Sequence, residues 1–306
     1  MTRAPGSESA PPAADQRLAF LVNPAAGNGK RAGTADAVQV RLEGGGFHVT
    51  RLQGVDGPDA ADLARSAVAD GFRSLVVLGG DGIAHLALQS VAGTEVTLGV
   101  IPTGTGNDIA RDLRLPLKDP LAAADVVVAG NRRTIDLARA GSTYYATVLA
   151  SGFDSRVNER ANLMRWPRGQ MRYNLATLAE LRVFEPLPYT LELDGERVCC
   201  EAMLVAVGNG PSYGGGLRMC EGALLDDGRL DVVVITPISK PELLKVYPRL
   251  FKGTHVNHPA YRHYRVEQAS IAAPGIVAYA DGERLGPLPL TVDVAPAALS
   301  VFAPSP

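Results

Sequence analysis

The chain has 306 residues, of which 46% are hydrophobic and 20% are charged, and its formal net charge is −2. This length exceeds that of a typical single domain, so two domains are expected. The sequence pI of about 6.2 argues against nucleic-acid binding, which usually requires a basic surface.

The first 16 residues are rich in Ala, Pro, Ser and Gly, and this composition predicts a disordered tail (1–16) rather than a signal peptide. No run of 18 or more apolar residues occurs, so no transmembrane helix is predicted. The three cysteines are Cys199, Cys200 and Cys220. An adjacent pair rarely forms a disulfide, and no Cys-x-x-Cys spacing exists, so a reducing compartment such as the cytoplasm is favoured.

From residue 17 to 133 the sequence alternates apolar strands with helical patterns. Strands are predicted at 17–22, 47–52, 75–78 and 96–101. Helices are predicted around Ala35, Val38 and Leu42, then at 58–69 with Gly57 or Asp56 as its cap, and at 83–91, 107–113 and 121–129. This alternation predicts an α/β, Rossmann-like nucleotide domain with a parallel sheet covered on both faces.

From residue 134 to 306 the pattern changes to short alternating strands. They are predicted at 134–139, 143–150, 188–193, 197–207, 229–236, 263–272, 276–280 and 290–294. Hairpin signals such as Asp194-Gly195, Asp227-Gly228 and Asp281-Gly282 separate some of them, which predicts an antiparallel β-sandwich. A helical insert at about 156–183 and a short helix at 240–251 interrupt this domain.

Two glycine-rich, aspartate-bearing turns each follow an apolar run that is typical of a buried strand. The first is Gly79-Gly80-Asp81-Gly82 and the second runs from Pro102 to Asp108. At the carboxyl edge of a parallel sheet, such turns offer bare backbone N–H groups to a phosphate. A carboxylate there can hold Mg²⁺ through its waters. Two such turns on one sheet predict a nucleoside triphosphate site.

None of the glycine turns matches a known phosphate-binding signature by itself. The run 27–30 lacks the first glycine and the final hydroxyl residue of a Walker A loop, because Pro24 and Arg31 stand at those positions. His85 and Ile109 occupy the last glycine position of a dinucleotide-binding signature. Taken alone, each glycine segment is more often only a turn.

The combination is more specific. Asn23-Pro24 with Gly27 and Gly29, then the turn at 79–82, then the segment 102–108 occur in that order. This arrangement resembles the catalytic domain of the diacylglycerol kinase family of lipid kinases, which also contains sphingosine and ceramide kinases. The resemblance extends from about Leu18 to Phe302. It implies a nucleotide domain joined to a β-sandwich, and transfer of the ATP γ-phosphate to a lipid hydroxyl, with diacylglycerol as the leading acceptor.

The resemblance also implies residue roles. ATP would be bound by Asn23, Pro24, Gly27, Gly29, Lys30, Gly79, Gly80, Asp81, Gly82, Thr105, Gly106, Asn107 and Asp108. The chemistry of the residues agrees, because glycines allow close approach and Thr105 offers a hydroxyl to a phosphate oxygen. Asp81 and Asp108 would orient Mg²⁺ and the phosphates. Asp108 can equally serve as a helix N-cap, or do both.

Two sites in the second domain follow from the same resemblance. A structural Mg²⁺ loop would use the carbonyls of Leu224 and Arg229 with the side chain of Asp227, although Asp227-Gly228 by itself indicates only a hairpin turn. Glu283, with Asp281 beside it, matches the carboxylate that accepts the proton of the lipid hydroxyl. Asp281-Gly282 is by itself also an ordinary turn signal.

The chain departs from the family pattern beside the first glycine turn. The family usually has Thr and then an Asn-Glu pair where Ile83, His85 and Leu86 stand here, and a Thr near the position of Gln53. A kinase of another acceptor (a sphingoid base, a soluble polyol or NAD) and a non-catalytic lipid- or nucleotide-binding protein therefore remain alternatives. A zinc site is the minor alternative for His255, His258 and His263, and a surface loop the favoured one.

The segment 156–182 interleaves basic and apolar side chains. Its arginines are Arg156, Arg160, Arg165, Arg168, Arg172 and Arg182, and Trp166 lies among them. Such a run is either a solvated helix face or a surface that docks on anionic headgroups. The expected partners are thus ATP, a lipid substrate and, transiently, the inner membrane surface, without nucleic acid; homodimer formation is left open.

Overall fold

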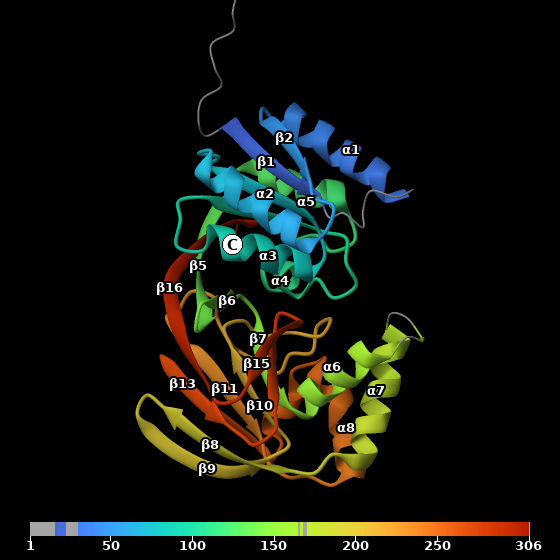
Figure 1. The fold of residues 1–306 in the computed structure, drawn as a ribbon, viewed down its shortest axis with the longest axis vertical. Helices are drawn as coiled ribbons and strands as arrows, with labels where there is room; N and C mark the ends of the chain where they lie inside the picture. Colours follow the sequence, from blue (N-terminus) through green and yellow to red (C-terminus); the bar gives the residue numbers. More distant parts are fainter. Residues whose placement is uncertain (1–15, 23–29, 165, 168–169, 306) are drawn as a thin grey trace, which may run out of the picture.

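The computed structural model describes residues 16–22, 30–164, 166–167 and 170–305. Figure 1 shows an α/β part, built mainly from the described residues up to Ala129, and a β-rich part below it. Two sheets organise these parts. The larger has the order β2-β1-β3-β4-β16-β13-β8-β9 with β5 and β6 beside β16, and the smaller has the order β12-β11-β10-β7-β14-β15.

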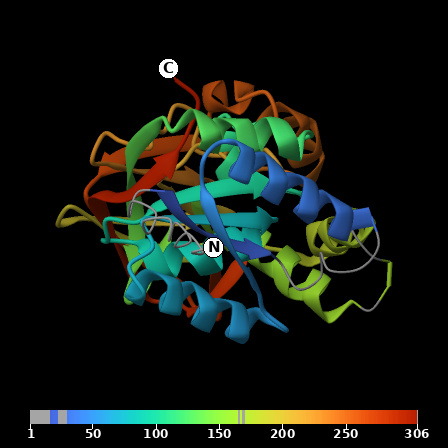
Figure 2. The ribbon, with the colours of Figure 1, turned by 90° about the horizontal axis from the view of Figure 1, so that it is seen from above.

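The first part is a parallel sheet covered by helices on both faces. Its strands are β1 (Arg17–Val22), β2 (His48–Gln53), β3 (Ser74–Gly79) and β4 (Thr97–Pro102), and its helices are α1 (Lys30–Gly44), α2 (Gly57–Ala69), α3 (Asp81–Val91), α4 (Asp108–Asp112) and α5 (Pro120–Ala129). Figure 2 shows the sheet between its helices. The predicted α/β class is confirmed.

The alternation of side chains along the strands explains this layering. Leu18, Phe20 and Val22 pack in one cluster with residues of α1 and α5, whereas Ala19 and Leu21 pack in another with residues of α2 and α3. Successive strand side chains point to opposite faces, so a strand that is apolar throughout must be covered twice. The helix α2 begins at the predicted cap Asp56, whose side chain accepts a hydrogen bond from the Asp59 N–H.

The second part is an antiparallel sandwich with helices on one side. Its strands are β5 (Arg132–Ala140), β6 (Thr143–Tyr145), β7 (Val148–Gly152), β8 (Leu187–Leu193), β9 (Glu196–Ala202), β10 (Leu204–Gly208), β11 (Leu230–Ile235), β12 (Tyr261–Val266), β13 (Gln268–Ala272), β14 (Val277–Ala280), β15 (Glu283–Pro287) and β16 (Leu290–Phe302). Apolar side chains of both sheets share one core cluster, which includes Leu191, Val205 and Val292. The predicted β-sandwich is therefore confirmed.

The helical insert consists of α6 (Phe153–Leu163) and α7 (Gln170–Val183), and α8 (Lys240–Leu250) precedes the short 3₁₀ helix η3 (Thr254–Asn257). These helices lie beside the sandwich in Figure 1. No helix among the described residues is long and apolar enough to cross a membrane.

The long strand β16 joins the two parts. Its end pairs in parallel with β4 through Ser300 and Thr97, while its beginning pairs antiparallel with β13. It also pairs with β5 along the whole length of that strand. The domain boundary that the sequence predicted between residues 133 and 134 falls inside β5. The C-terminal end of the chain therefore returns to the first part. The strand ends of the parallel sheet β1–β4 face the second part.

Candidate active site

A cavity of about 470 Å³ lies where the two parts meet. The first part contributes Asp81, Gly82, Thr105, Gly106 and Asp108, and the second contributes, among others, Thr147, Asp154, Arg172, Tyr213, Gly215, Asp281 and Glu283. These residues come from strand ends and turns of both parts, as expected for a ligand site at the carboxyl edge of a parallel sheet. Residues predicted for ATP and for proton transfer thus share one cavity.

Asp81 links the first glycine segment (79–82) to the second (102–108) by hydrogen bonds. It occupies the first turn of α3, directly after β3, and its Oδ2 accepts a hydrogen bond from the Asn107 N–H at 2.6 Å. Its Oδ1 accepts one from the Asp108 N–H at 2.7 Å. Oδ1 also accepts a longer hydrogen bond from the Ile109 N–H at 3.4 Å. The carboxylate therefore holds the start of α4, and its Oδ2 retains a lone pair for a further ligand.

The two glycine segments approach so closely that side chains do not fit between them. A Cβ on Gly104 would lie 2.5 Å from the Cα of Gly80, and a Cβ on Gly106 would lie 2.7 Å from Asp81 Oδ2. The Thr103 N–H donates to the Gly79 carbonyl at 2.8 Å. Glycine is therefore required at 104 and 106 by space, whatever binds there.

Asn107 and Asp108 stabilise the segment in different ways. The Asn107 side chain accepts a hydrogen bond from the Gly104 N–H at 3.0 Å and donates one to the Gly104 carbonyl at 2.9 Å, with φ of 55°. Asp108 accepts the Gly215 N–H at 2.8 Å through Oδ2. Asp108 therefore contacts the second part, and the glycine loop at 214–216 forms the opposite wall of the cavity.

Buried carboxyl groups concentrate at this place. Burial and the charge of Asp108 raise the pKa of Asp81 to about 6, and burial raises the pKa of Asp108 although backbone N–H groups and Arg111 oppose the shift. Burial also raises the pKa of Asp112, which accepts a hydrogen bond from the Ser212 hydroxyl, to about 7. Mutual repulsion between carboxylates is relieved by a divalent cation, so Asp81 and Asp108 fit a Mg²⁺ ion.

Asp281 and Glu283 lie at the β14–β15 hairpin but differ in environment. Asp281 (φ 51°) and Gly282 (φ 85°) make the turn, a conformation typical of a two-residue hairpin. The Asp281 carboxylate is buried and accepts four hydrogen bonds: from His85 at 3.0 Å, the Ala146 N–H at 3.1 Å, the Thr147 N–H at 2.9 Å and the Thr147 hydroxyl at 2.6 Å. Its oxygens are therefore occupied by the protein itself.

Glu283 is exposed to the cavity. Its Oε1 lies 3.3 Å from the place where a Cβ on Gly82 would stand, so it reaches across to the first glycine turn. This carboxylate comes from the second part and meets the segment predicted to hold phosphates. The β15 strand that carries it was not recognised in the sequence, because the run Glu283-Arg284-Leu285-Gly286-Pro287 lacks strand composition.

The loop predicted as a structural Mg²⁺ site has another arrangement. Asp227 Oδ1 accepts the Arg229 N–H at 3.0 Å, and its Oδ2 forms an ion pair with Arg265. The guanidinium already neutralises this carboxylate, and no cluster of three potential side-chain ligands exists in the described part of the chain. Asp227 is therefore part of the turn and of an ion pair, and the cation predicted at Leu224, Asp227 and Arg229 stays a prediction.

Several predicted residues lie outside the described part. They are Asn23, Pro24, Gly27 and Gly29; of Lys30, only its place at the start of α1 is described. The three histidines do not converge. His255 is buried and contacts the Met219 carbonyl, so the predicted surface loop is wrong for this residue. His258 contacts Glu242, and His263 contacts Asp231.

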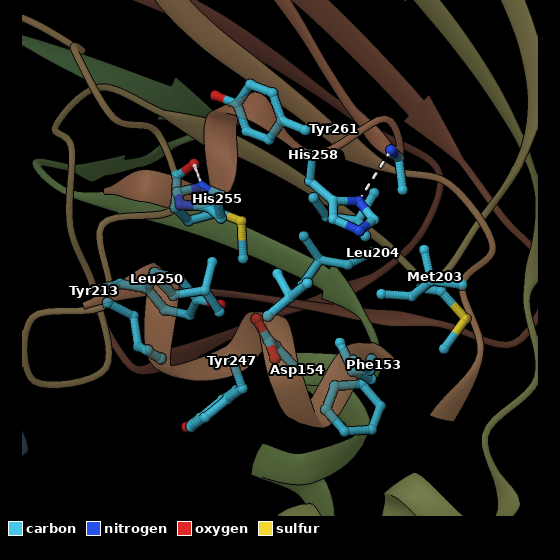
Figure 3. A pocket seen from close by; sticks show the side chains of 17 residues that line it. Phe153, Asp154, Met203, Leu204, Tyr213, Tyr247, Leu250, His255, His258 and Tyr261 are labelled. Atoms are coloured by element: carbon cyan, nitrogen blue, oxygen red, sulfur yellow. Dashed lines mark hydrogen bonds between the residues drawn. The ribbon is translucent and has the colours of Figure 1, made fainter. Parts of the chain in front are cut away.

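A second, narrow cavity of about 50 Å³ adjoins the first (Figure 3). It lies between α8 and the smaller sheet, and its lining is almost wholly apolar, with Leu204, Ile235, Leu243 and Leu250 among its residues. Phe153, Asp154, Tyr213, Leu217 and Tyr247 line both cavities. The polar cavity and the apolar one therefore share a wall.

Comparison with known proteins matches two family models to this chain. Residues 17–140 match the family model of the diacylglycerol kinase catalytic domain, and residues 147–303 match that of the YegS C-terminal NAD kinase beta sandwich-like domain. The structure superimposes on a crystal structure of a diacylglycerol kinase from Bacillus anthracis with a TM-score of 0.73, at 20% identity, over 94% of this chain and 97% of the other. The fold and the domain matches together define a kinase, a phosphotransferase.

Curated relatives narrow this class. A diacylglycerol kinase of Mycobacterium tuberculosis is 45% identical over 94% of this chain and 95% of its own length. A diacylglycerol kinase of Bacillus subtilis is 27% identical over 90% of this chain and 92% of its own length. The chain belongs to the diacylglycerol kinase family and is a lipid kinase.

Proposed function

We propose that this lipid kinase transfers the γ-phosphate of ATP to the free hydroxyl of diacylglycerol, giving phosphatidic acid for phospholipid biosynthesis. The observation that carries the proposal is the position of Glu283, a carboxylate of the second part that faces Gly82 across one cavity with Asp81 and Asp108. A phosphate donor on one wall and a proton acceptor on the other is the arrangement that phosphoryl transfer requires.

The first part is the donor side. The close glycine contacts place the backbone of residues 81–82 and 105–106 at the cavity, and Thr105 lines it with a hydroxyl group. Asp81 and Asp108 hold Mg²⁺, which neutralises phosphate charge when it is bound. Asp81 also fixes the segment 107–109 through the backbone, so one side chain serves both the loop and the ion.

The second part is the acceptor side. Glu283 accepts the proton of the lipid hydroxyl while a new bond forms between that oxygen and the γ-phosphorus, and the bond from phosphorus to the bridging oxygen of ADP breaks. Asp281 is assigned as a positioning residue, because its two oxygens hold His85 and the residues 146–147. It fixes the hairpin from which Glu283 projects.

The lipid enters with its headgroup in the polar cavity and part of one acyl chain in the apolar cavity. The residues that line both cavities mark this path. The apolar lining favours a lipid over NAD or a soluble polyol, because burying polar groups there without partners is costly.

The membrane contact of this proposal is made by the α6–α7 end of the helical insert. Leu163 and Trp166 are 85% and 81% exposed, and Met171 is exposed beside them. The same helix α7 lines the cavity through Arg172, Tyr173 and Thr177. Exposed apolar side chains and Trp next to a lipid-binding cavity suit insertion into the cytoplasmic face of a bilayer.

The experiment is a transfer assay with γ-³²P-labelled ATP, Mg²⁺ and a panel of acceptors: diacylglycerol, a sphingoid base, glycerol and NAD. We expect labelled phosphatidic acid, and a loss of kcat of about 10²- to 10⁴-fold in Glu283→Gln. Glu196→Gln, an exposed glutamate outside the cavities, is the matched control. Binding of ATP without transfer to any lipid, or full activity of a folded Glu283→Gln variant, would overturn the proposal.

A further inference from the structure

Asp154 is a carboxyl group at the junction of the two cavities. It lies in the first turn of α6 and lines both the polar cavity and the apolar one. Figure 3 shows its carboxyl group among apolar side chains, with Phe153 and Tyr247 near it. The donor and acceptor roles proposed above do not use it.

One oxygen of the carboxyl group lacks a partner. The residue as a whole is partly exposed, but its Oδ2 is buried and makes no hydrogen bond with the described residues. Burial alone raises the pKa of Asp154 to about 7, so the proton is retained to unusually high pH. A buried carboxyl group without a partner costs stability, so packing of the fold does not explain an aspartate at this position.

The titratable groups around Asp154 give it no counter-ion. The pKa values of Tyr247 of α8 and Tyr189 of β8 are raised first by burial and further by the charge of Asp154. His255 and His258 line the same apolar cavity but contact Met219 and Glu242, and Arg172 lines the polar cavity. Within the described ranges no cation forms an ion pair with Asp154. A ligand is therefore the natural partner of this group.

We propose that the protonated carboxyl group of Asp154 donates a hydrogen bond to an ester carbonyl of the acceptor lipid, and that Asp154 thereby selects ester-linked acceptors. The inference rests on the proposed function. A diacylglycerol presents one hydroxyl group and two ester carbonyls, which only accept hydrogen bonds. With the hydroxyl at Glu283 and an acyl chain in the apolar cavity, the ester groups come to the place where the cavities join.

An ionised carboxylate would repel an ester carbonyl, whereas a neutral carboxyl group can donate to it. The selectivity for esters should therefore be present below pH 7 and disappear as the pH rises through about 7, where the Asp154 carboxyl group loses its proton. Asparagine retains a donor at the same position and has no such titration. Leucine retains the volume and has no donor.

The test compares two acceptors that differ only in the carbonyl: 1,2-dioleoylglycerol and its 1,2-di-O-oleyl ether analogue, in mixed micelles with labelled ATP. We expect the wild-type protein at pH 6 to favour the ester by about 3- to 10-fold in kcat/KM, the value of one hydrogen bond. Asp154→Asn should keep this ratio from pH 6 to 8.5, and Asp154→Leu should bring it to about 1. Asp226→Asn, an exposed carboxylate outside both cavities, should behave as the wild type.

The outcomes separate this inference from the proposed function. Transfer to both lipids with the same ratio in the wild type and in Asp154→Leu would overturn the inference and leave the proposed function intact. A preference for a sphingoid base, whose ammonium group donates, together with its loss in Asp154→Asn, would overturn it as well. No transfer to either lipid by the folded wild-type protein would overturn the proposed function and the inference with it.

Discussion

His85 Nδ1 lies 3.0 Å from Asp281 Oδ2, so a side chain of α3 in the first part contacts the β14–β15 turn of the second part. His85 thereby directs a polar side chain at the hairpin that carries Glu283. The catalytic carboxylate proposed above is thus held in place from the opposite wall of its own cavity.

Asp281→Asn tests this connection. An amide cannot accept hydrogen bonds through both of its terminal atoms, so two of the four buried donors lose their partner. We expect the free energy of unfolding to fall by about 2–4 kcal/mol and kcat to fall with it. Asp194→Asn is the matched control, because Asp194 occupies the same kind of turn with φ of 48° but is exposed. An equal loss in both variants, measured by urea denaturation, would show that only the turn matters.

The His85–Asp281 contact should also make stability depend on pH. Burial lowers the pKa of His85, but the hydrogen bond and charge of Asp281 outweigh it, so the pKa is raised above 6.5. The folded state then binds the proton more tightly than the unfolded state. The contact stabilises fully below pH 6.5, and this contribution is lost as the pH rises through the higher folded-state value.

The measurement is the melting temperature of the wild type and of His85→Gln between pH 5 and 8.5. We expect the difference in stability to be about 1 kcal/mol at pH 5.5 and to shrink steadily at alkaline pH. Other groups that titrate do so in both proteins, so their effects cancel. A difference that stays constant over the whole range would mean that packing of His85, and not its charge, is what matters.

The close contact between the two glycine segments, 79–82 and 102–108, gives a further prediction. A Cβ at Gly104 would lie 2.5 Å from the Gly80 backbone and 2.8 Å from Asn107 Oδ1, so Gly104→Ala must separate the segments. We expect a loss of about 1–3 kcal/mol in stability and at least about tenfold weaker ATP binding by calorimetry, since misplaced N–H groups no longer converge.

Gly57→Ala is its control. Nothing lies within 4 Å of a Cβ at Gly57, which begins α2. A change within about 0.5 kcal/mol is expected there. If Gly104→Ala bound ATP as tightly as the wild type, the glycine segments would not be part of the nucleotide site.

The sequence was sufficient for features that depend on neighbouring residues. The buried strands that end at 79 and 102, the glycine turns after them and the change of pattern near 134 are all local signals. They predict that Asp81 and Asp108 lie at one edge of the sheet, whereas Glu283 was added only through the family resemblance. The Asp281-Gly282 motif can be interpreted either as a hairpin turn or as part of a site. The two interpretations are compatible, because Asp281 makes a hairpin turn and also lines the cavity.

Features that depend on distant residues were not accessible in the same way. Arg265, 38 residues from Asp227, neutralises its carboxylate, and nothing near Asp227 in the sequence indicates this. The pairing of β16 with β4 joins residues about 200 positions apart. Asp112 and Asp154 stand beside other polar residues within helices, and burial of one such residue leaves no periodic signal. His85 alone had a visible sign, its place in an otherwise apolar stretch after the glycine turn.

The exposed end of the helical insert carries the last prediction. Of the arginines there, Arg160 pairs with Glu180 and Arg156 donates to the Gly275 carbonyl, so part of the basic charge is already engaged within the protein. We therefore expect the apolar side chains, rather than charge, to decide membrane binding. Leu163→Ser with Trp166→Ser should lower the affinity for anionic liposomes in co-sedimentation by at least about 10-fold, because the loss of about two buried CH₂ groups, at about 0.8 kcal/mol each, already gives that factor.

The control uses an apolar side chain that is equally exposed elsewhere. Val55 is 83% exposed on the first part, far along the chain from the insert, and Val55→Ser should bind liposomes as the wild type does. Transfer to diacylglycerol dispersed in detergent should be unchanged in the double variant, because neither side chain lines the cavity. Equal liposome binding by the double variant and Val55→Ser would exclude this end of α6 and α7 as the docking surface. Weak binding that salt abolishes in every variant would assign docking to charge instead.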